Sequence, residues 1–214
     1  MLLEASEANP SSVISAVSAS VLTTLPFVFH LADLTVSRGW EPHVARSRLY
    51  RWIKAGLVAP LGGLSEVYAN LIVSQYPDWE MGIRMVMPTA VVTGLEILRR
   101  AGWITQIPYL PTITVRCDQR SYRVSRFNIT GQTPAWFESM SPGITEGDGV
   151  ALPFLAPAWA LADIICHEGW QRCGIDPDDI YWDQVTKADA HDWTRACHAL
   201  GMGDMPMNPE IARR

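Results

Sequence analysis

The chain has 214 residues, of which 48% are hydrophobic and 18% are charged, and its formal net charge at pH 7 is −5. This composition excludes an intrinsically disordered chain, and the length allows one large domain or two small ones. The acidic balance also argues against a protein that coats nucleic acid indiscriminately.

The N-terminal segment has no basic stretch of the kind that begins a signal peptide. The apolar run over residues 13–29 is too short and too rich in Ser and Thr for a membrane span. We expect a buried helix over residues 12–24 instead, and no membrane partner. The four cysteines lack CxxC spacing, which indicates reduced thiols in a cytoplasmic protein.

Two helices are predicted next, over residues 27–38 and 42–55. Pro42 suits the first turn of the second helix, and Gly56 suits the position just past its end.

Short apolar strands are expected at residues 57–59 and 66–69, joined by a turn at residues 61–64. The order of helix, helix, strand and strand predicts a winged helix-turn-helix domain over residues 1–72. The turn carries no Lys or Arg, so this wing would contact phosphates weakly.

The second predicted helix is amphipathic. At about 100° per residue, Ala45, Leu49, Trp52 and Ile53 share one arc, which we expect to face the core. The opposite arc and its flank hold side chains that donate hydrogen bonds or carry positive charge: His43, Arg46, Ser47, Arg48, Tyr50, Arg51 and Lys54.

Such a face can bond phosphates and read base edges in a major groove, so we predict that these residues bind DNA. The alternative is an ordinary solvated face. Exposed helices usually balance Arg and Lys with Glu, whereas residues 42–59 contain no acid.

The pattern weakens after residue 71, and we place a domain boundary between residues 72 and 86. A mixed α+β domain is expected over residues 86–200, followed by a flexible tail over residues 201–214. Its expected elements are a helix over 88–100, strands over 103–107, 112–116 and 122–129, an extended segment at 153–155, and a helix over 157–166.

Candidate catalytic or metal-binding residues are few. A zinc site built from Cys166, Cys173, Cys197 and nearby histidines lacks the usual close ligand spacing, and Cys166 is expected on the apolar face of its helix. The aspartates from Asp176 to Asp183 are explained better by helix capping than by Mg²⁺ binding. We therefore assign no catalytic, cofactor-binding or metal-binding residue.

Negative charge is concentrated at the end of the chain, where residues 141–214 carry a net −7. An acidic domain could complement a basic partner protein. Aromatic side chains often anchor such interfaces, and four tryptophans in or near this region are candidates: Trp136, Trp170, Trp182 and Trp193.

Three stretches together resemble the AbiEi-type antitoxins of type IV toxin–antitoxin systems, which are known from abortive phage infection. They are Ser-Arg-Leu-Tyr-Arg-Trp-Ile-Lys-Ala-Gly-Leu-Val at 47–58, the segment 87–115 with its Gly-Trp-Ile-Thr-Gln-Ile-Pro, and Pro-Phe-Leu-Ala-Pro-Ala-Trp-Ala-Leu-Ala-Asp-Ile-Ile within 150–165. The chain departs from the family in its uncharged wing tip and in Trp159, which stands where the family has Glu.

The resemblance implies a non-enzymatic protein with two roles. Its N-terminal winged helix would bind inverted repeats in its own operator and regulate transcription. Its C-terminal domain would neutralise a nucleotidyltransferase-type toxin. Two alternatives stay open: a plain winged-helix regulator with a ligand-sensing or dimerisation domain, and an enzyme or mobile-element protein that does not bind DNA.

Overall fold

The computed structural model describes residues 20–149 and 151–209. The chain divides into two compact units, one ending at Val86 and the other beginning at Met87. Helices combined with two separate sheets confirm the predicted α+β class. Within the described residues, no helix has both the length and the apolar character that a membrane span requires.

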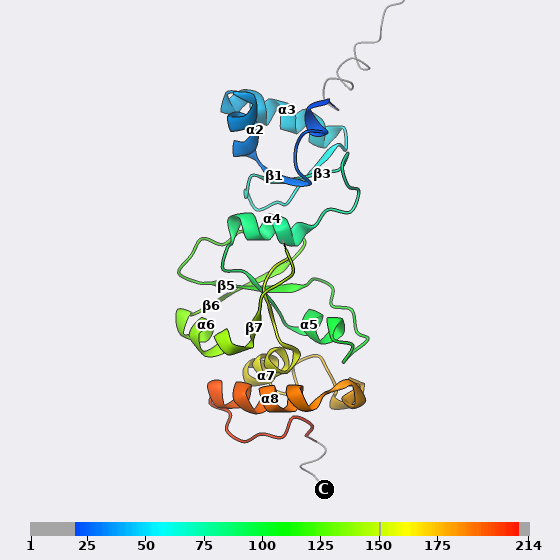
Figure 1. Cartoon of the computed structure of the whole chain (residues 1–214), viewed down its shortest axis with the longest axis vertical. Coiled ribbons are helices and arrows are strands. Elements are labelled where there is room, and N and C mark those ends of the chain that lie inside the picture. Colours follow the sequence, from blue (N-terminus) through cyan, green and yellow to red (C-terminus); the bar gives the residue numbers. More distant parts are fainter. Residues whose placement is uncertain (1–19, 150, 210–214) are drawn as a thin grey trace, which may run out of the picture. The chain divides into compact units, whose positions relative to one another are not determined.

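The first unit contains a three-stranded antiparallel sheet in the order β1 (Val28–His30), β3 (Val67–Asn70) and β2 (Val58–Pro60). Two helices, α2 (Leu31–Arg38) and α3 (Pro42–Lys54), follow β1 in the chain and lie on one face of this sheet (Figure 1). The core of the unit therefore sits between the helix pair and the sheet.

Helix α4 (Trp79–Val86) packs on the opposite face of the same sheet (Figure 1). The approach is close at Gly82, where a Cβ would lie 3.3 Å from a methyl group of Val67 and 3.5 Å from one of Val28. The first unit thus extends to Val86, the upper end of the range of 72–86 in which we expected the domain boundary, and it includes helix α4, which the sequence pattern did not predict.

The helix expected over residues 27–38 was wrong at its start, because Val28–His30 form strand β1. Val28 pairs with Ala69 of β3, and this non-local pairing overrides the local helical pattern. His30 then caps α2, since its Nδ1 accepts a hydrogen bond from the Ala32 amide at 3.0 Å. Of the helix expected over residues 12–24, residues 12–19 lie outside the described part; residues 20–22 are helical and 23–24 form a turn.

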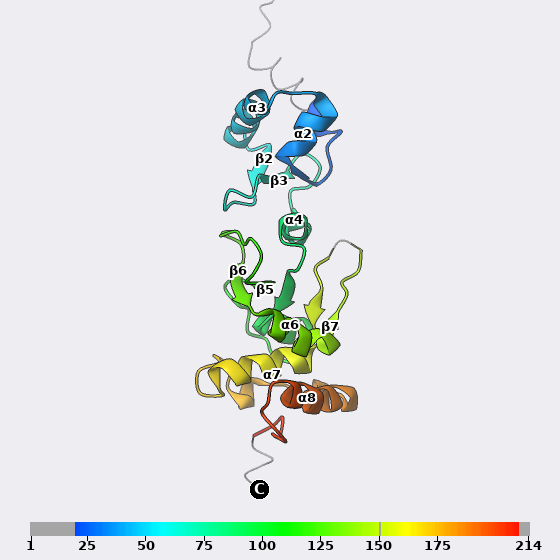
Figure 2. The ribbon, with the colours of Figure 1, turned by 90° about the vertical axis from the view of Figure 1, so that its left-hand side faces the viewer.

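The second unit contains a five-stranded mixed sheet. Its strands run in the order β6 (Asn128–Gln132), β5 (Thr112–Arg116), β4 (Val91–Thr93), β8 (Phe154–Leu155) and β7 (Ile144–Thr145). Strand β4 pairs antiparallel with β5 and parallel with β8. Helices α7 (Pro157–Glu168) and α8 (Lys187–Ala199) lie side by side in Figures 1 and 2.

Helices α5 (Leu95–Arg100) and α6 (Pro134–Met140) complete the unit, with short 3₁₀ turns at Ser141–Gly143, Pro177–Asp179 and Trp182–Gln184. The carboxylate of Asp176 caps a 3₁₀ turn and not an α-helix, because it accepts a hydrogen bond from the Asp178 amide at 3.1 Å.

Three expectations for this unit need correction. The single helix expected over residues 88–100 is instead strand β4, a break at Gly94 and helix α5. Residues 103–107 form no strand, and the strand expected over 122–129 begins only at Asn128. In each case pairing within the sheet, and not the local pattern, decides where the strands lie.

The C-terminal tail was expected to be flexible from residue 201. As far as residue 209 it is instead attached to α8. The indole Nε1 of Trp193 donates a 2.7 Å hydrogen bond to the Met205 carbonyl, and His198 Nε2 lies 3.1 Å from a carboxylate oxygen of Asp204. Residues 210–214 lie outside the described part.

Candidate nucleic-acid interface

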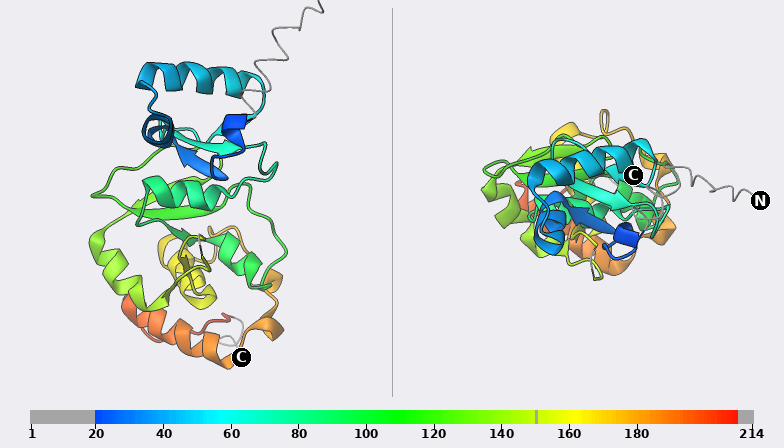
Figure 3. Two further views of the ribbon diagram at one scale, coloured as in Figure 1. Left: turned by 45° about the horizontal axis from the view of Figure 1, so that its top comes forward. Right: turned by 90° about the horizontal axis from the view of Figure 1, so that it is seen from above.

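The inner face of α3 anchors it to the first unit. Ala45, Leu49 and Trp52 are buried in one cluster with Phe29 and Leu34. Half-buried Ile53 packs against the same cluster. The arc expected to face the core does so, and the opposite arc is turned away from the sheet. Figure 3 shows α3 lengthwise in its left panel.

The outer face of α3 carries the residues that the sequence singled out for DNA contact. Six of them are exposed, and the seventh, Arg48, is half-buried. Their exposure follows from the amphipathic pattern, because burying the apolar arc leaves the polar arc in solvent. The exposed six are His43, Arg46, Ser47, Tyr50, Arg51 and Lys54.

Two of the arginines are held by aromatic or acidic neighbours. The Arg46 Nη2 lies 3.0 Å from the Oε1 of Glu66. The Arg48 guanidinium lies 4.1 Å from the centre of the Trp40 ring, in a cation–π contact, and Trp40 in turn packs against Trp52. Arg48 is therefore partly structural, and Arg46 is partly neutralised.

Arg51 and Lys54 are both exposed in the C-terminal half of α3. The Arg51 Nε is 3.4 Å from the Ser47 carbonyl, one helical turn earlier, and the Lys54 ammonium lies 5.6 Å from the centre of the Tyr50 ring. Neither cation has a carboxylate among these contacts. Both charges therefore stay available to an anionic partner.

The loop between β2 and β3 is built from unusual backbone conformations. Gly62 and Gly63 have positive φ, and so do Leu64 (58°) and Glu66 (56°). The loop tip exposes 90% of Leu64 and carries no cation. Sequence reasoning missed Glu66, which lies 20 positions from Arg46 and has no local signal that would pair the two.

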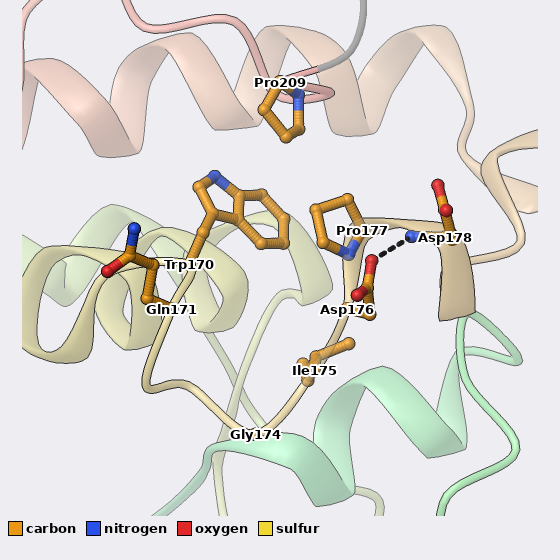
Figure 4. A pocket seen from close by; sticks show the side chains of 8 residues that line it. All are labelled: Trp170, Gln171, Gly174, Ile175, Asp176, Pro177, Asp178 and Pro209. Atoms are coloured by element: carbon orange, nitrogen blue, oxygen red, sulfur yellow. Dashed lines mark hydrogen bonds between the residues drawn. The ribbon is translucent and has the colours of Figure 1, made fainter.

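The second unit has an acidic groove around residues 170–181. One cavity of about 690 Å³ is lined by the rings of Trp170, Pro177 and Pro209, which gather around the same space together with Asp176 and Asp178 (Figure 4). A neighbouring cavity of about 470 Å³ shares Gly174 and Asp178 with it.

Of the four tryptophans named as interface candidates, Trp170 lines this groove. The other three make contacts inside the second unit. Trp136 and Trp182 donate hydrogen bonds to Asp163 and to the Pro177 carbonyl, and Trp193 is buried.

The cysteines are all free thiols. Cys166 is exposed, which corrects the expectation that it faces the apolar side of its helix. Cys197 is buried, and burial, with a smaller contribution from Cys166, raises its pKa to about 11, so the thiolate is disfavoured at neutral pH. Across residues 20–149 and 151–209, no three His, Cys, Asp or Glu side chains gather as metal ligands would.

No family model and no curated protein matches the chain. Among solved structures it is similar to the crystal structure of the RV2827C protein from Mycobacterium tuberculosis, with a TM-score of 0.55 and 15% sequence identity over 95% of this chain and 82% of that chain. At this identity the similarity concerns the fold alone.

Proposed function

We propose that the first unit is a winged helix-turn-helix that binds operator DNA through the outer face of α3. In this proposal α2 and α3 are the helix-turn-helix, α3 is the recognition helix, and β2 and β3 form the wing. The observation that carries the proposal is a face of donors and cations with no acid in α3 itself. Because the wing tip lacks cations, α3 would supply most of the DNA contact.

We further propose that the protein is a cytoplasmic, non-enzymatic antitoxin that represses its own operon. The second unit would neutralise a nucleotidyltransferase-type toxin. Support comes from the resemblance of residues 47–58, 87–115 and 150–165 to AbiEi-type antitoxins, and from the net charge of −7 after residue 140. The acidic groove beside Trp170 offers one surface for a basic partner.

The DNA-binding proposal is tested by fluorescence anisotropy with a labelled duplex from the region upstream of the gene. We expect tighter binding to this duplex than to a shuffled duplex of the same composition, and protection of inverted repeats in a footprint. Equal affinity for both duplexes would overturn operator recognition.

The antitoxin proposal is tested by co-expression with the neighbouring gene in a growth assay. Expression of a nucleotidyltransferase-type neighbour alone should arrest growth, and co-expression of this chain should restore it. A neighbour without toxicity would instead favour a plain winged-helix regulator. DNA binding without rescue of a toxic neighbour would contradict the antitoxin role.

A further inference from the structure

Strand β6 lies at an open edge of the five-stranded sheet in the second unit. It pairs with β5 on one side, and among the described residues no strand pairs with its other side. The opposite edge of the sheet ends in β7, which has only two residues, whereas β6 has five. An edge of this length presents a row of backbone groups to which another strand can bond.

The backbone of β6 alternates between its two sides. The Asn128 amide donates a 2.9 Å hydrogen bond to the Pro111 carbonyl, on the inner side of the strand that faces β5. The Gln132 carbonyl also faces inward, where it accepts a 2.9 Å hydrogen bond from the amide that follows β5. Because successive residues of a strand direct their N–H and C=O groups to opposite sides, Ile129 and Gly131 direct theirs outward.

The sequence of β6 lacks the features that usually protect an edge strand. Natural edge strands are protected by Lys, by Pro, by a bulge or by being very short. Strand β2 of the first unit ends in Pro60, and β7 is short. Strand β6 reads Asn-Ile-Thr-Gly-Gln, without proline or a charged residue, and its register with β5 is continuous over its whole length. Its outer edge is therefore open to pairing.

The strand is complementary to a second copy of itself. In an antiparallel pairing centred on Thr130, Ile129 would lie opposite Gly131 of the second copy. Asn128 would lie opposite Gln132 of the second copy. Since Ile129 and Gly131 direct their backbone groups outward, this register forms hydrogen-bonded pairs on both sides of the centre. No like charges meet, because the strand is uncharged, and each carboxamide faces a carboxamide, which can both donate and accept.

A row of threonine hydroxyls indicates the same centre. The hydroxyl oxygens of Thr93 and Thr114 are 2.9 Å apart, and those of Thr114 and Thr130 are 3.1 Å apart. The row crosses β4, β5 and β6 in a polar cavity of about 380 Å³, which residues of α7 also line, and it ends at the open edge. Pairing centred on Thr130 would place the two Thr130 side chains opposite each other in a non-hydrogen-bonded pair, where side chains are closest. The row would then continue into the second copy.

We infer that the protein forms a two-fold symmetric dimer through antiparallel pairing of its β6 strands, which joins the two sheets into one continuous sheet. The occupant of the edge is a second copy because the register that satisfies the outward backbone groups also places compatible side chains opposite each other. A single edge strand buries little surface compared with permanent dimer interfaces, so the dimer should be weak and depend on concentration. The inference concerns the second unit and does not rest on the proposed function.

The first test is sedimentation velocity of the full chain over a range of concentrations. The sedimentation coefficient should rise with concentration for the native chain and for Gly131→Ala, which keeps the outward N–H and whose Cβ would meet Cys117 at an ordinary 3.4 Å. Gly131→Pro removes that N–H from both copies and should weaken dimerisation by about tenfold. A native chain that stays monomeric, or a folded proline variant that dimerises equally well, would overturn the inference.

Disulfide cross-linking tests the register, and it decides the matter if the proline variant does not fold. The exposed cysteines, Cys117 and Cys166, are first replaced by Ser. Thr130→Cys should then form a disulfide-linked dimer on oxidation with copper phenanthroline, because the two copies of this residue lie opposite each other. Asn128→Cys is the matched control, since its two copies would be about 14 Å apart along the strands, too far for a disulfide. No cross-link at Thr130, or equal cross-linking at both positions, would overturn the pairing.

Amide hydrogen exchange locates the interface and separates the possible occupants. The Ile129 and Gly131 amides should be protected at high protein concentration and exchange fast at low concentration, because only the dimer covers them. The Thr130 amide, which faces β5, should be protected at both concentrations. Protection that appears only when another protein is added would assign the edge to a foreign strand and would overturn the dimer. A dimer in which Ile129 and Gly131 exchange fast would place the interface elsewhere and would equally overturn the inference.

Discussion

Arg46 of α3 and Glu66 of the loop before β3 form an ion pair, with 3.0 Å between Nη2 and Oε1. The Glu66 carbonyl also accepts a 2.9 Å hydrogen bond from the amide of Leu31, the first residue of α2. One residue of the loop therefore contacts both helices of the proposed DNA-binding motif. It also places a carboxylate beside cations that we propose to contact phosphates.

Replacing Glu66 with Gln should strengthen DNA binding. The change frees Arg46 to contact a phosphate, and it removes a negative charge that repels the phosphates of the DNA. We expect the affinity for DNA to rise by about threefold. Both side chains are well exposed, so the stability of the unit should change by less than about 1 kcal/mol. Fluorescence anisotropy at one fixed salt concentration measures the affinity. As a control, Glu146→Gln removes one negative charge from the second unit and should leave the DNA affinity unchanged. Weaker DNA binding by Glu66→Gln would count against the proposed interface.

The second unit should fold without the first when the chain is cut at the unit boundary. A fragment of residues 87–214 should give a dispersed NMR spectrum and a cooperative melt. A fragment of residues 73–214 should be less soluble, because it keeps α4 without Val28 and Val67, against which Gly82 packs. A collapsed spectrum for 87–214 would contradict the division between Val86 and Met87.

Gly143→Ala should destabilise the second unit strongly. A Cβ at Gly143 would lie 2.2 Å from Cγ of Trp159, a residue only 1% exposed, so the buried indole must move. We expect a loss of about 3 kcal/mol in unfolding free energy, the upper range for overpacking. Gly131→Ala is the matched control, because its Cβ would meet Cys117 at an ordinary 3.4 Å. Equal urea midpoints for the two variants would refute the close packing.

Glu96 should make the second unit sensitive to acid. Its side chain is 9% exposed, and the carboxylate accepts hydrogen bonds from Arg99 and Arg100. The Arg99 guanidinium, assisted by Arg100, holds the pKa of Glu96 below its ordinary value of 4.5, although burial alone would raise it. A lowered folded-state pKa stabilises the fold above pH 4.5, and this contribution is lost as the pH falls through the folded pKa.

The measurement is the difference in unfolding free energy between the native chain and Glu96→Gln as a function of pH. The difference should be constant between pH 7 and about pH 5.5 and should shrink at lower pH, where Glu96 becomes protonated. The corresponding difference for Glu146→Gln should vary less. A Glu96→Gln difference that does not depend on pH would show that the carboxylate charge is not stabilising.

Local sequence patterns predicted α3 well because an amphipathic helix encodes its own orientation. The spacing of Ala45, Leu49 and Trp52 placed all three on the buried arc, and the polar arc followed. The same reasoning failed at β4. Val91, Val92 and Thr93 are all buried in a strand with neighbours on both sides, so they show no alternation. Gly94, with a φ of +74°, separates this strand from α5.

Long-range contacts lay beyond sequence reasoning. The Arg46–Glu66 pair joins residues 20 positions apart. In the second unit, Thr93 of β4 and His167 of α7 line the same polar cavity although they are 74 positions apart in the chain. Neither carries a motif with fixed spacing. The shared face of α3 could be predicted, whereas the carboxylate beside it and the cavity under α7 required the fold.

The salt dependence of DNA binding tests the central claim most directly. The affinity for the upstream duplex is measured at several salt concentrations for the native chain and for the variant with Arg46, Arg51 and Lys54 replaced by Ala. A control variant replaces Arg120, Arg172 and Lys187 of the second unit with Ala. We predict that the slope of log affinity against log salt falls by about one unit for each phosphate that the α3 variant no longer neutralises, and that it stays unchanged in the control. An unchanged slope and affinity in the α3 variant would contradict the account.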